Sequence, residues 1–239
     1  MIRVTIWNEF WHEKNEEAVK KLYPEGMHMC LKNALQCGDF IIDTAYLEKD
    51  EEHGLSKETL DNTDVLLWWG HCRHGDVKDS VVERVCRRVN EGMGFIPLHS
   101  AHGSKPFGKL MGTDCTLIWR DANEPAHVWT VAPNHPITQG IPLEFKLESE
   151  EMYGEYFSIP KPDDLVFITW FKGGNVFRGG CTFTRGLGKI FYFHPGHEFC
   201  PSFYNPNVIA VIKNAIYWAN PSEKRNLEGG AYKKEIEVI

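Results

Sequence analysis

The sequence predicts an α/β fold built on a mostly parallel β-sheet with an antiparallel extension. Up to residue 98, short apolar runs typical of buried strands alternate with segments of helical spacing. This β-α-β-α-β-α-β order predicts parallel strands joined by right-handed crossovers. Between residues 165 and 193, apolar runs are joined instead by glycine-rich turns, which are typical of antiparallel strands.

Four buried strands are expected in the first half, and each is a short apolar run: 2–7, 40–45, 64–69 and 94–98. Helices are expected between them, through residues 18–22, 27–35, 56–60 and 76–91, with Ser56 as an N-cap. The clearest helix is 76–91, where five valines form one apolar stripe at helical spacing before Gly92 and Gly94.

Prolines and glycines interrupt the second half. Four prolines divide residues 113–150 into short strand-like pieces, 115–119 and 126–131. The sequence Gly173-Gly174-Asn175 lies between apolar runs and predicts a hairpin. A final helix is expected over 205–219. We therefore expect one domain over residues 1–220, followed by a charged tail over 221–239.

The composition excludes several classes of protein. Its hydrophobic and charged fractions, 42% and 25%, are ordinary for a globular chain. A formal net charge of −7 without a dense lysine and arginine cluster argues against nucleic-acid binding. No apolar run is long enough to span a membrane, and the N-terminus resembles a strand more than a signal peptide. Seven cysteines without Cys-x-x-Cys spacing argue against a disulfide framework, so we expect a cytoplasmic protein.

The most informative motif is His-x-x-His, which occurs three times, each directly after an apolar run, at residues 71–74, 99–102 and 194–197. With 11 histidines in 239 residues, random placement would give about half such a pair. If the apolar runs are parallel strands, the pairs lie at their carboxyl ends, where open α/β sheets bind ligands.

Residues in two of these segments are candidate catalytic groups. His99, His102 and His197 qualify because imidazole titrates near neutral pH. Ser100 lies at the expected strand-to-helix turn, where nucleophile elbows occur, although Gly-x-Ser-x-Gly spacing is absent. Glu198 would orient an imidazole or act as a base. The alternatives are hydrogen-bonded turn histidines and a substrate-binding or structural Ser100.

Aromatic and acidic residues near the same sheet edge indicate a sugar ligand. Trp11 and Tyr153 would stack on sugar C–H surfaces while Glu151 accepts hydroxyl hydrogen bonds. His71 and His194 complete the expected substrate-binding set. The alternative is that both aromatic residues only cap the core and that Glu151 is solvated.

Imidazoles from several strand ends also suit a divalent metal such as zinc, which takes three or four ligands of this kind. No local zinc signature is present, and carboxylates or backbone groups would satisfy the histidines equally well. No cofactor is therefore certain. If a metal binds, the expected ligands are five histidines: His71, His74, His99, His102 and His197.

Four segments, in order and spacing, resemble the ThuA-like (trehalose-utilisation) family of the class I glutamine amidotransferase-like superfamily. They are residues 94–102, 134–142, 150–153 and 188–197, and with the strand pattern they cover most of residues 1–220. The resemblance implies a flavodoxin-like, doubly wound sheet with an antiparallel extension.

The resemblance also frames the chemistry. In class I amidotransferases a cysteine occupies the elbow, and a His-Pro-Glu segment supplies the base and its orienting group. This chain has Ser100 near the elbow and His194-Pro195-Gly196 in the second segment, with Glu198 displaced by two residues. Glutamine hydrolysis through a thioester is therefore not expected, because the thiolate nucleophile is missing. The family's association with trehalose points to a carbohydrate or keto-sugar.

Three functional hypotheses follow. The first is an enzyme that acts on a disaccharide or keto-sugar derivative by histidine-based acid/base or metal-assisted chemistry. The second is a non-catalytic sugar-binding or assembly module on a degenerate amidotransferase fold. The third is a serine hydrolase that uses Ser100. A homo-oligomer is expected, since the tail and the many aromatic residues suit a subunit interface.

Overall fold

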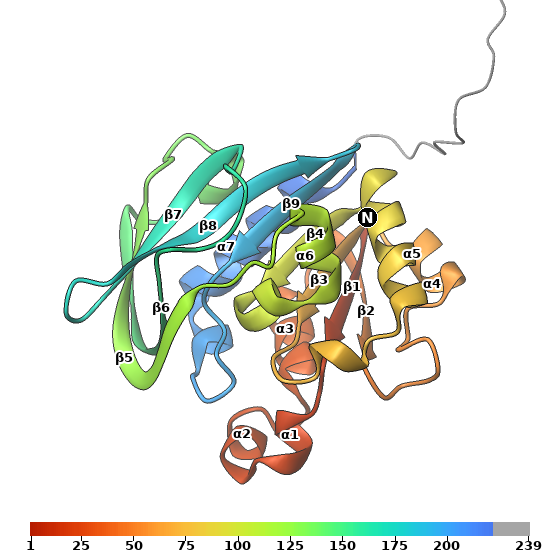
Figure 1. The fold of residues 1–239 in the computed structure, drawn as a ribbon, viewed down its shortest axis with the longest axis horizontal. Coiled ribbons are helices and arrows are strands. Elements are labelled where there is room, and N and C mark those ends of the chain that lie inside the picture. Colours follow the sequence, from red (N-terminus) through yellow and green to blue (C-terminus); the bar gives the residue numbers. More distant parts are fainter. Residues whose placement is uncertain (222–239) are drawn as a thin grey trace, which may run out of the picture.

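The computed structural model describes residues 1–221, and the expected charged tail lies almost entirely outside them. One nine-stranded sheet runs through the described chain (Figure 1). Its order is β2 (Phe40–Tyr46), β1 (Ile2–Asn8), β3 (Val65–Trp69), β4 (Gly94–Leu98), β9 (Gly188–Phe193), β8 (Val176–Arg185), β7 (Asp164–Phe171), β5 (Ile118–Thr130) and β6 (Glu144–Gly154).

The sheet has two halves of different character. β2, β1, β3, β4 and β9 are all paired in parallel, and we call them the parallel half. β8, β7, β5 and β6 are paired antiparallel to their neighbours and form the antiparallel extension. The expected α/β class and the expected extension are both confirmed.

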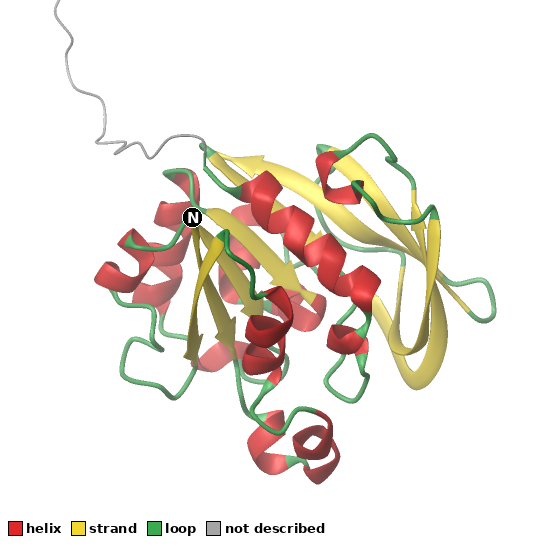
Figure 2. Ribbon diagram, turned by 180° about the vertical axis from the view of Figure 1, so that it is seen from behind, coloured by secondary structure: helices red, strands yellow, loops and turns green. Residues whose placement is uncertain are grey.

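Helices cover both faces of the parallel half, as a doubly wound sheet requires. One face carries α3 (Met27–Leu35) and the long α7 (Pro206–Ala219), which lies in front in Figure 2. The other carries α4 (Lys57–Asp61), α5 (Asp79–Asn90) and α6 (Lys105–Met111). Two apolar cores result, one on each side of the sheet. Two short helices, α1 (His12–Asn15) and α2 (Glu17–Leu22), lie beyond the end of β1 (Figure 1).

Local sequence signals explain several element boundaries. The Ser56 side chain accepts a hydrogen bond from the Thr59 backbone N–H, which confirms the expected N-cap of α4. The valine-rich helix starts at Asp79, later than expected, because a separate 3₁₀ turn, η1 (His74–Asp76), precedes it. The sequence predicted a strand-to-helix turn before helix α6 but gave no bounds for the helix, which Ser104 caps and which has Pro106 in its first turn.

The expected division of residues 113–150 by prolines is wrong in one place. β5 is a single 13-residue strand that passes through Pro125. Its pairing with β6 shifts register between Glu124 and Ala126, and its pairing with β7 begins only at Ala126. Pro125 therefore lies at a bulge, where its missing N–H costs no ladder hydrogen bond.

Candidate functional site

A cavity of about 480 Å³ lies at the carboxyl edge of the parallel half, where the sequence placed the site. Loops after β1, β3, β4 and β9 supply its histidines, and β5 and β6 of the extension close its other side. The lining residues are His12, Glu16, His71, His74, Ser100, His102, Gly103, Trp119, Asp121, Glu151, Tyr153, His197, Glu198 and Phe199.

The turn after β4 has the geometry of an elbow, but its strained residue is not Ser100. His99 has a φ of 50°, in the left-handed region that non-glycine residues rarely adopt. Ser100 follows it in the 3₁₀ turn η2 (His99–Gly103), and its hydroxyl donates to the Gly70 carbonyl at 2.8 Å. The placement of Ser100 at the elbow is thus corrected by one residue.

His99 is fully buried behind the cavity wall and holds Glu151 in place. Its Nε2–H donates to Glu151 Oε2 at 3.0 Å, and its Nδ1–H donates to the His194 carbonyl at 2.8 Å. Both ring nitrogens therefore act as donors, as in an imidazolium. The Tyr153 hydroxyl lies 3.2 Å from His99 Nε2, and the two rings stack. Thus one imidazole positions both the carboxylate and the phenol of β6.

The charges of this cluster reinforce one another. Burial by itself lowers the pKa of His99, but the hydrogen bond to Glu151 and the nearby carboxylates outweigh it and raise the pKa to about 9. Burial raises the pKa of Glu151, yet its hydrogen bond with His99 brings it below the usual value. Burial raises the pKa of Tyr153 well above its normal value. At neutral pH the cluster therefore holds a carboxylate, an imidazolium and a neutral phenol.

Glu150, the neighbour of Glu151, braces the loop after β9. Its carboxylate is fully buried and accepts hydrogen bonds from the Gly196 and His197 backbone N–H groups at 2.9 and 3.0 Å. It also accepts from the Ser202 hydroxyl at 2.6 Å. These hydrogen bonds link the extension to the loop that carries His197 and Glu198.

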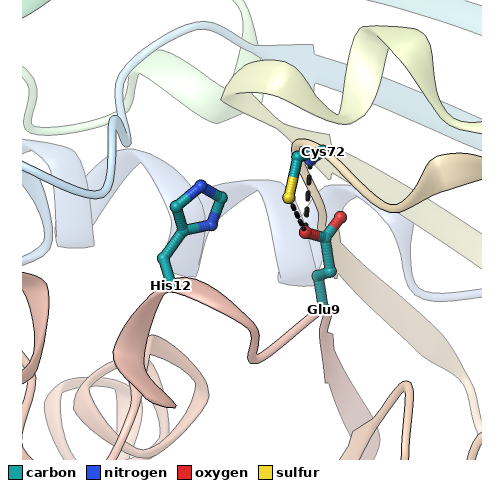
Figure 3. A group of neighbouring side chains, drawn as sticks. All are labelled: Glu9, His12 and Cys72. Carbon is teal, nitrogen blue, oxygen red and sulfur yellow. Dashed lines mark hydrogen bonds between the residues drawn. The ribbon is translucent and has the colours of Figure 1, made fainter. Parts of the chain in front are cut away.

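A second carboxylate organises the loop after β3. Glu9, at the end of β1, accepts from the backbone N–H groups of His71 at 2.8 Å, Arg73 at 2.9 Å and Cys72 at 3.2 Å. The Cys72 thiol also donates to it at 3.1 Å, and His12 lies across from this pair (Figure 3). Partial desolvation of the thiol and its hydrogen bond to Glu9 raise the pKa of Cys72 to about 12, which favours the protonated form.

Glu198 lies between two imidazoles. Its Oε1 is 2.8 Å from His71 Nδ1 and 3.3 Å from His12 Nε2. The His12 and His71 rings stack with their centroids 5.0 Å apart. His197 approaches from the same loop, with its Nε2 3.8 Å from Glu198 Oε2 and 3.8 Å from Glu151 Oε2. Burial and the charge of His99 lower the pKa of His197.

The remaining predicted site residues have different positions. His102 and His74 line the cavity, and His102 Nδ1–H donates to the Cys115 carbonyl at 2.8 Å. Burial lowers the pKa of His102 to about 4. His194 lies behind the wall, where its Nε2–H donates to the Glu151 carbonyl at 3.0 Å. Trp11 packs edge-on against His12 but is not part of the cavity lining.

Eight residues of the site were not among the predicted ones: His12, Glu16, Gly103, Trp119, Asp121 and Phe199 line the cavity, and Glu9 and Glu150 hold its loops by hydrogen bonds. Glu9 and His12 directly follow the first strand, where the strand-end argument selected Trp11, and the same argument applies to them. Trp119 lies on β5, which the sequence placed in separate pieces. No sequence signal distinguishes buried Glu150 from its neighbours.

Three groups of side chains among the described residues bring potential metal-ligand atoms within 4.8 Å of one another. They are Glu9 with His12 and Cys72, His12 with His71 and Glu198, and His99 with Glu151 and His197. Of the five histidines predicted as ligands, His71, His99 and His197 lie in such groups, whereas His74 and His102 do not.

Comparison with known proteins identifies the family of the chain. A family model described as trehalose utilisation, ThuA, matches residues 3–219. The chain belongs to the ThuA family. Membership implies a role in trehalose utilisation, and the resemblance found in the sequence is confirmed. No curated protein matches the chain.

Solved structures support the ThuA fold. A ThuA-like protein from Bacteroides uniformis superimposes with a TM-score of 0.67 at 17% identity, covering 91% of each chain. A ThuA-like protein from Parabacteroides merdae gives 0.62 at 15% identity, over 94% of this chain and 92% of its own. A glutamine amidotransferase from Thermotoga maritima gives 0.51 at 10% identity, over 91% and 97%. The amidotransferase-like architecture is therefore shared.

One further expectation concerned membranes. Among the described residues, none of the helices is both long and apolar enough to cross a lipid bilayer.

Proposed function

We propose that this ThuA protein is an enzyme that moves protons on a sugar derivative bearing a carbonyl group, with Glu151 as the base. The observation that carries the proposal is the His99–Glu151–Tyr153 cluster at the cavity wall. A carboxylate that accepts a proton and a phenol that donates a hydrogen bond lie side by side, and both face the cavity.

In this proposal Glu151 and Tyr153 have different tasks. Glu151 would accept the proton from the carbon next to the carbonyl, and Tyr153 would donate a hydrogen bond to the developing enolate oxygen. Return of the proton to the same carbon gives back the substrate or its epimer. Return to the former carbonyl carbon gives an isomer, provided that the neighbouring carbon carries a hydroxyl whose proton moves to the enolate oxygen as the new carbonyl forms. The high pKa of Tyr153 favours hydrogen-bond donation over loss of its proton. His99 is a positioning residue, because it touches Glu151 and Tyr153 but does not line the cavity.

The cavity also has the character of a sugar site. Trp119 and Phe199 offer ring faces, while Asp121 and Glu16 offer acceptors for hydroxyl groups. Its volume of about 480 Å³ lies within the usual range for small-molecule sites. A disaccharide or keto-sugar of trehalose utilisation fits this combination of size and chemistry.

Proton exchange with solvent tests the proposal directly. Trehalose, its keto derivatives and simple ketoses would be incubated with the protein in D₂O and followed by proton NMR. We expect deuterium to enter at the carbon next to the carbonyl of a keto-sugar. Glu151→Gln should slow this exchange by about 10²–10⁴-fold, the usual contribution of a general base. Glu148→Gln, on the same strand but exposed, is the matched control.

Two other outcomes would favour the alternatives, a sugar-binding module or a serine hydrolase. A sugar that binds without exchange or conversion, in wild type and Glu151→Gln alike, would make the protein a binding module. Labelling of Ser100 by a fluorophosphonate would favour a serine hydrolase. The geometry argues against the latter, because the Ser100 hydroxyl donates to a carbonyl and none of the described histidines accepts its proton.

A further inference from the structure

The side chains His12, His71 and Glu198 form a second cluster in the cavity, and we call it the His12 cluster. It combines residues from the loops after β1, β3 and β9. Two imidazoles and a carboxylate present potential ligand atoms within 4.8 Å of one another. All three residues line the cavity.

The spacing suits a small divalent cation. Glu198 Oε1 is 2.8 Å from His71 Nδ1 and 3.3 Å from His12 Nε2. Ligand atoms bound tetrahedrally to zinc at about 2.0–2.2 Å lie roughly 3.4 Å apart, so the two separations from Glu198 Oε1 are close to this value, and the two imidazoles lie within 4.8 Å of each other. The cluster is thus nearly arranged for coordination.

An unpartnered oxygen gives the second, independent sign. Glu198 is only 1% exposed, yet its Oε2 has no hydrogen-bond partner among the described residues. Leaving a buried carboxylate oxygen unpaired costs free energy, because its lost hydration is not replaced by a hydrogen bond. A cation between the two imidazoles and Glu198 would compensate the buried charge.

The neighbouring group of Glu9, His12 and Cys72 is a poorer candidate (Figure 3). Both oxygens of Glu9 already accept hydrogen bonds from backbone N–H groups. Coordination there would displace bonds that shape the loop after β3. The same objection applies to His99 with Glu151 and His197, because both ring nitrogens of His99 are engaged.

We propose that His12, His71 and Glu198 bind one divalent first-row transition metal ion, most favourably zinc. Two histidines and one carboxylate are a common ligand set of catalytic zinc sites, which keep a further position open for water or substrate. The three ligands line the same cavity as Glu151 and Tyr153, so a bound ion would be accessible to a molecule in it. A cation at this place would polarise a carbonyl oxygen of the substrate.

This inference differs from the ligand set expected from the sequence. His71 is common to both, but His12 and Glu198 replace His74, His99, His102 and His197. The metal site itself does not depend on the proposed reaction. Only its role in polarising a carbonyl rests on the proposed function.

Metal binding without substrate is the test. Full-length protein would be freed of metal with a chelator, and zinc or cobalt would be added in a calorimetric and an absorption titration. We expect one ion per chain, with cobalt giving visible bands of low coordination number. His71→Ala should weaken binding by at least about 100-fold, because loss of a ligand exceeds the usual 10–100-fold cost of losing an outer partner.

The choice of variants keeps the test interpretable. The His71 side chain is 34% exposed, so its removal should leave the fold intact, as circular dichroism would check. His12→Gln and Glu198→Gln should each weaken binding similarly. His102→Ala should not, because His102 lies outside all three groups. His127→Ala on the outer surface of β5 controls for nonspecific imidazole binding.

Two results would overturn the proposal: no stoichiometric binding at micromolar metal, or stoichiometric binding that His71→Ala leaves unchanged. Neither bears on the proton exchange assigned to Glu151, which is measured with a sugar in D₂O. Conversely, absence of exchange would leave the metal titration unaffected. The two proposals therefore fail separately.

Discussion

The two halves of the sheet contribute to the site in different ways. In the parallel half, functional side chains stand in loops after the strands, because parallel strands end together at one edge. In the antiparallel extension they stand within a strand, since Glu151 and Tyr153 are two residues apart on β6 and face the same side. The parallel half supplies the imidazoles and Glu198, while the extension supplies Glu151, Tyr153 and Trp119. The site forms only where the two halves meet.

The largest expected effect on stability comes from removing the Glu150 carboxylate, which joins the two halves by hydrogen bonds. Glu150→Ala removes a buried carboxylate that accepts hydrogen bonds from Gly196, His197 and Ser202. The variant loses charge-assisted hydrogen bonds and leaves their buried donors without acceptors. Its free energy of unfolding should therefore be lower by about 3 kcal/mol or more. Urea denaturation measures the loss.

Glu148→Ala is the matched control, because Glu148 lies on the same strand with an exposed side chain. It should change stability by less than about 0.5 kcal/mol. Equal losses in the two variants would mean that the extension does not support the loop after β9 through Glu150.

The next prediction concerns the ion pair that joins the halves. His99 comes from the parallel half and Glu151 from the extension, and the pKa of His99 is raised to about 9. A raised pKa means that the folded state binds the proton more tightly. Stability from this group is therefore complete below pH 6.5 and is lost as the pH rises through 9. The loss should reach about 3 kcal/mol at most.

Urea denaturation at several pH values between 6 and 9.5 checks this prediction. In Glu151→Gln the decline should be shallower, because its hydrogen bond to His99 is the largest contribution that raises that pKa. A wild-type protein whose stability stays constant over this range would show that His99 is not held as an imidazolium.

The parallel half was the more predictable part of the fold. Its strands and helices follow directly from apolar runs and helical spacing, and the edge rule then places His71, His99 and His197 near one cavity. In the extension, Pro125 predicted the end of a strand, but β5 continues through it by means of a β-bulge. Trp119 was therefore placed in a short separate strand. The elbow residue was misplaced by one position, because only the backbone φ of 50° shows that His99 is the left-handed residue.

Hydrogen-bond partners were beyond prediction for a different reason. Glu150 and Glu151 are adjacent and chemically identical, yet one braces a backbone loop and the other faces the cavity. The role of Glu150 depends on the loop after β9, some 45 residues later in the chain, and that of Glu151 on His99, 52 residues earlier. A pattern read along one segment contains no information on such a distant contact.

The smallest expected effect is on sugar binding, and it distinguishes two tryptophans, one from each half. Trp11 follows β1 and was expected to bind substrate, but Trp119 on β5 is the one that lines the cavity, with 66% of its surface exposed. Trp119→Ala should weaken sugar binding about five- to tenfold, which is about 1 kcal/mol for a stacking contact. Stability should change little, because the ring is exposed. Trp129→Ala, also exposed on β5 but outside the cavity, should bind sugar as wild type does. Sugar titrations monitored by calorimetry compare these variants with Trp11→Ala. A larger loss in Trp11→Ala than in Trp119→Ala would place the sugar against the parallel half and contradict the role assigned to the extension.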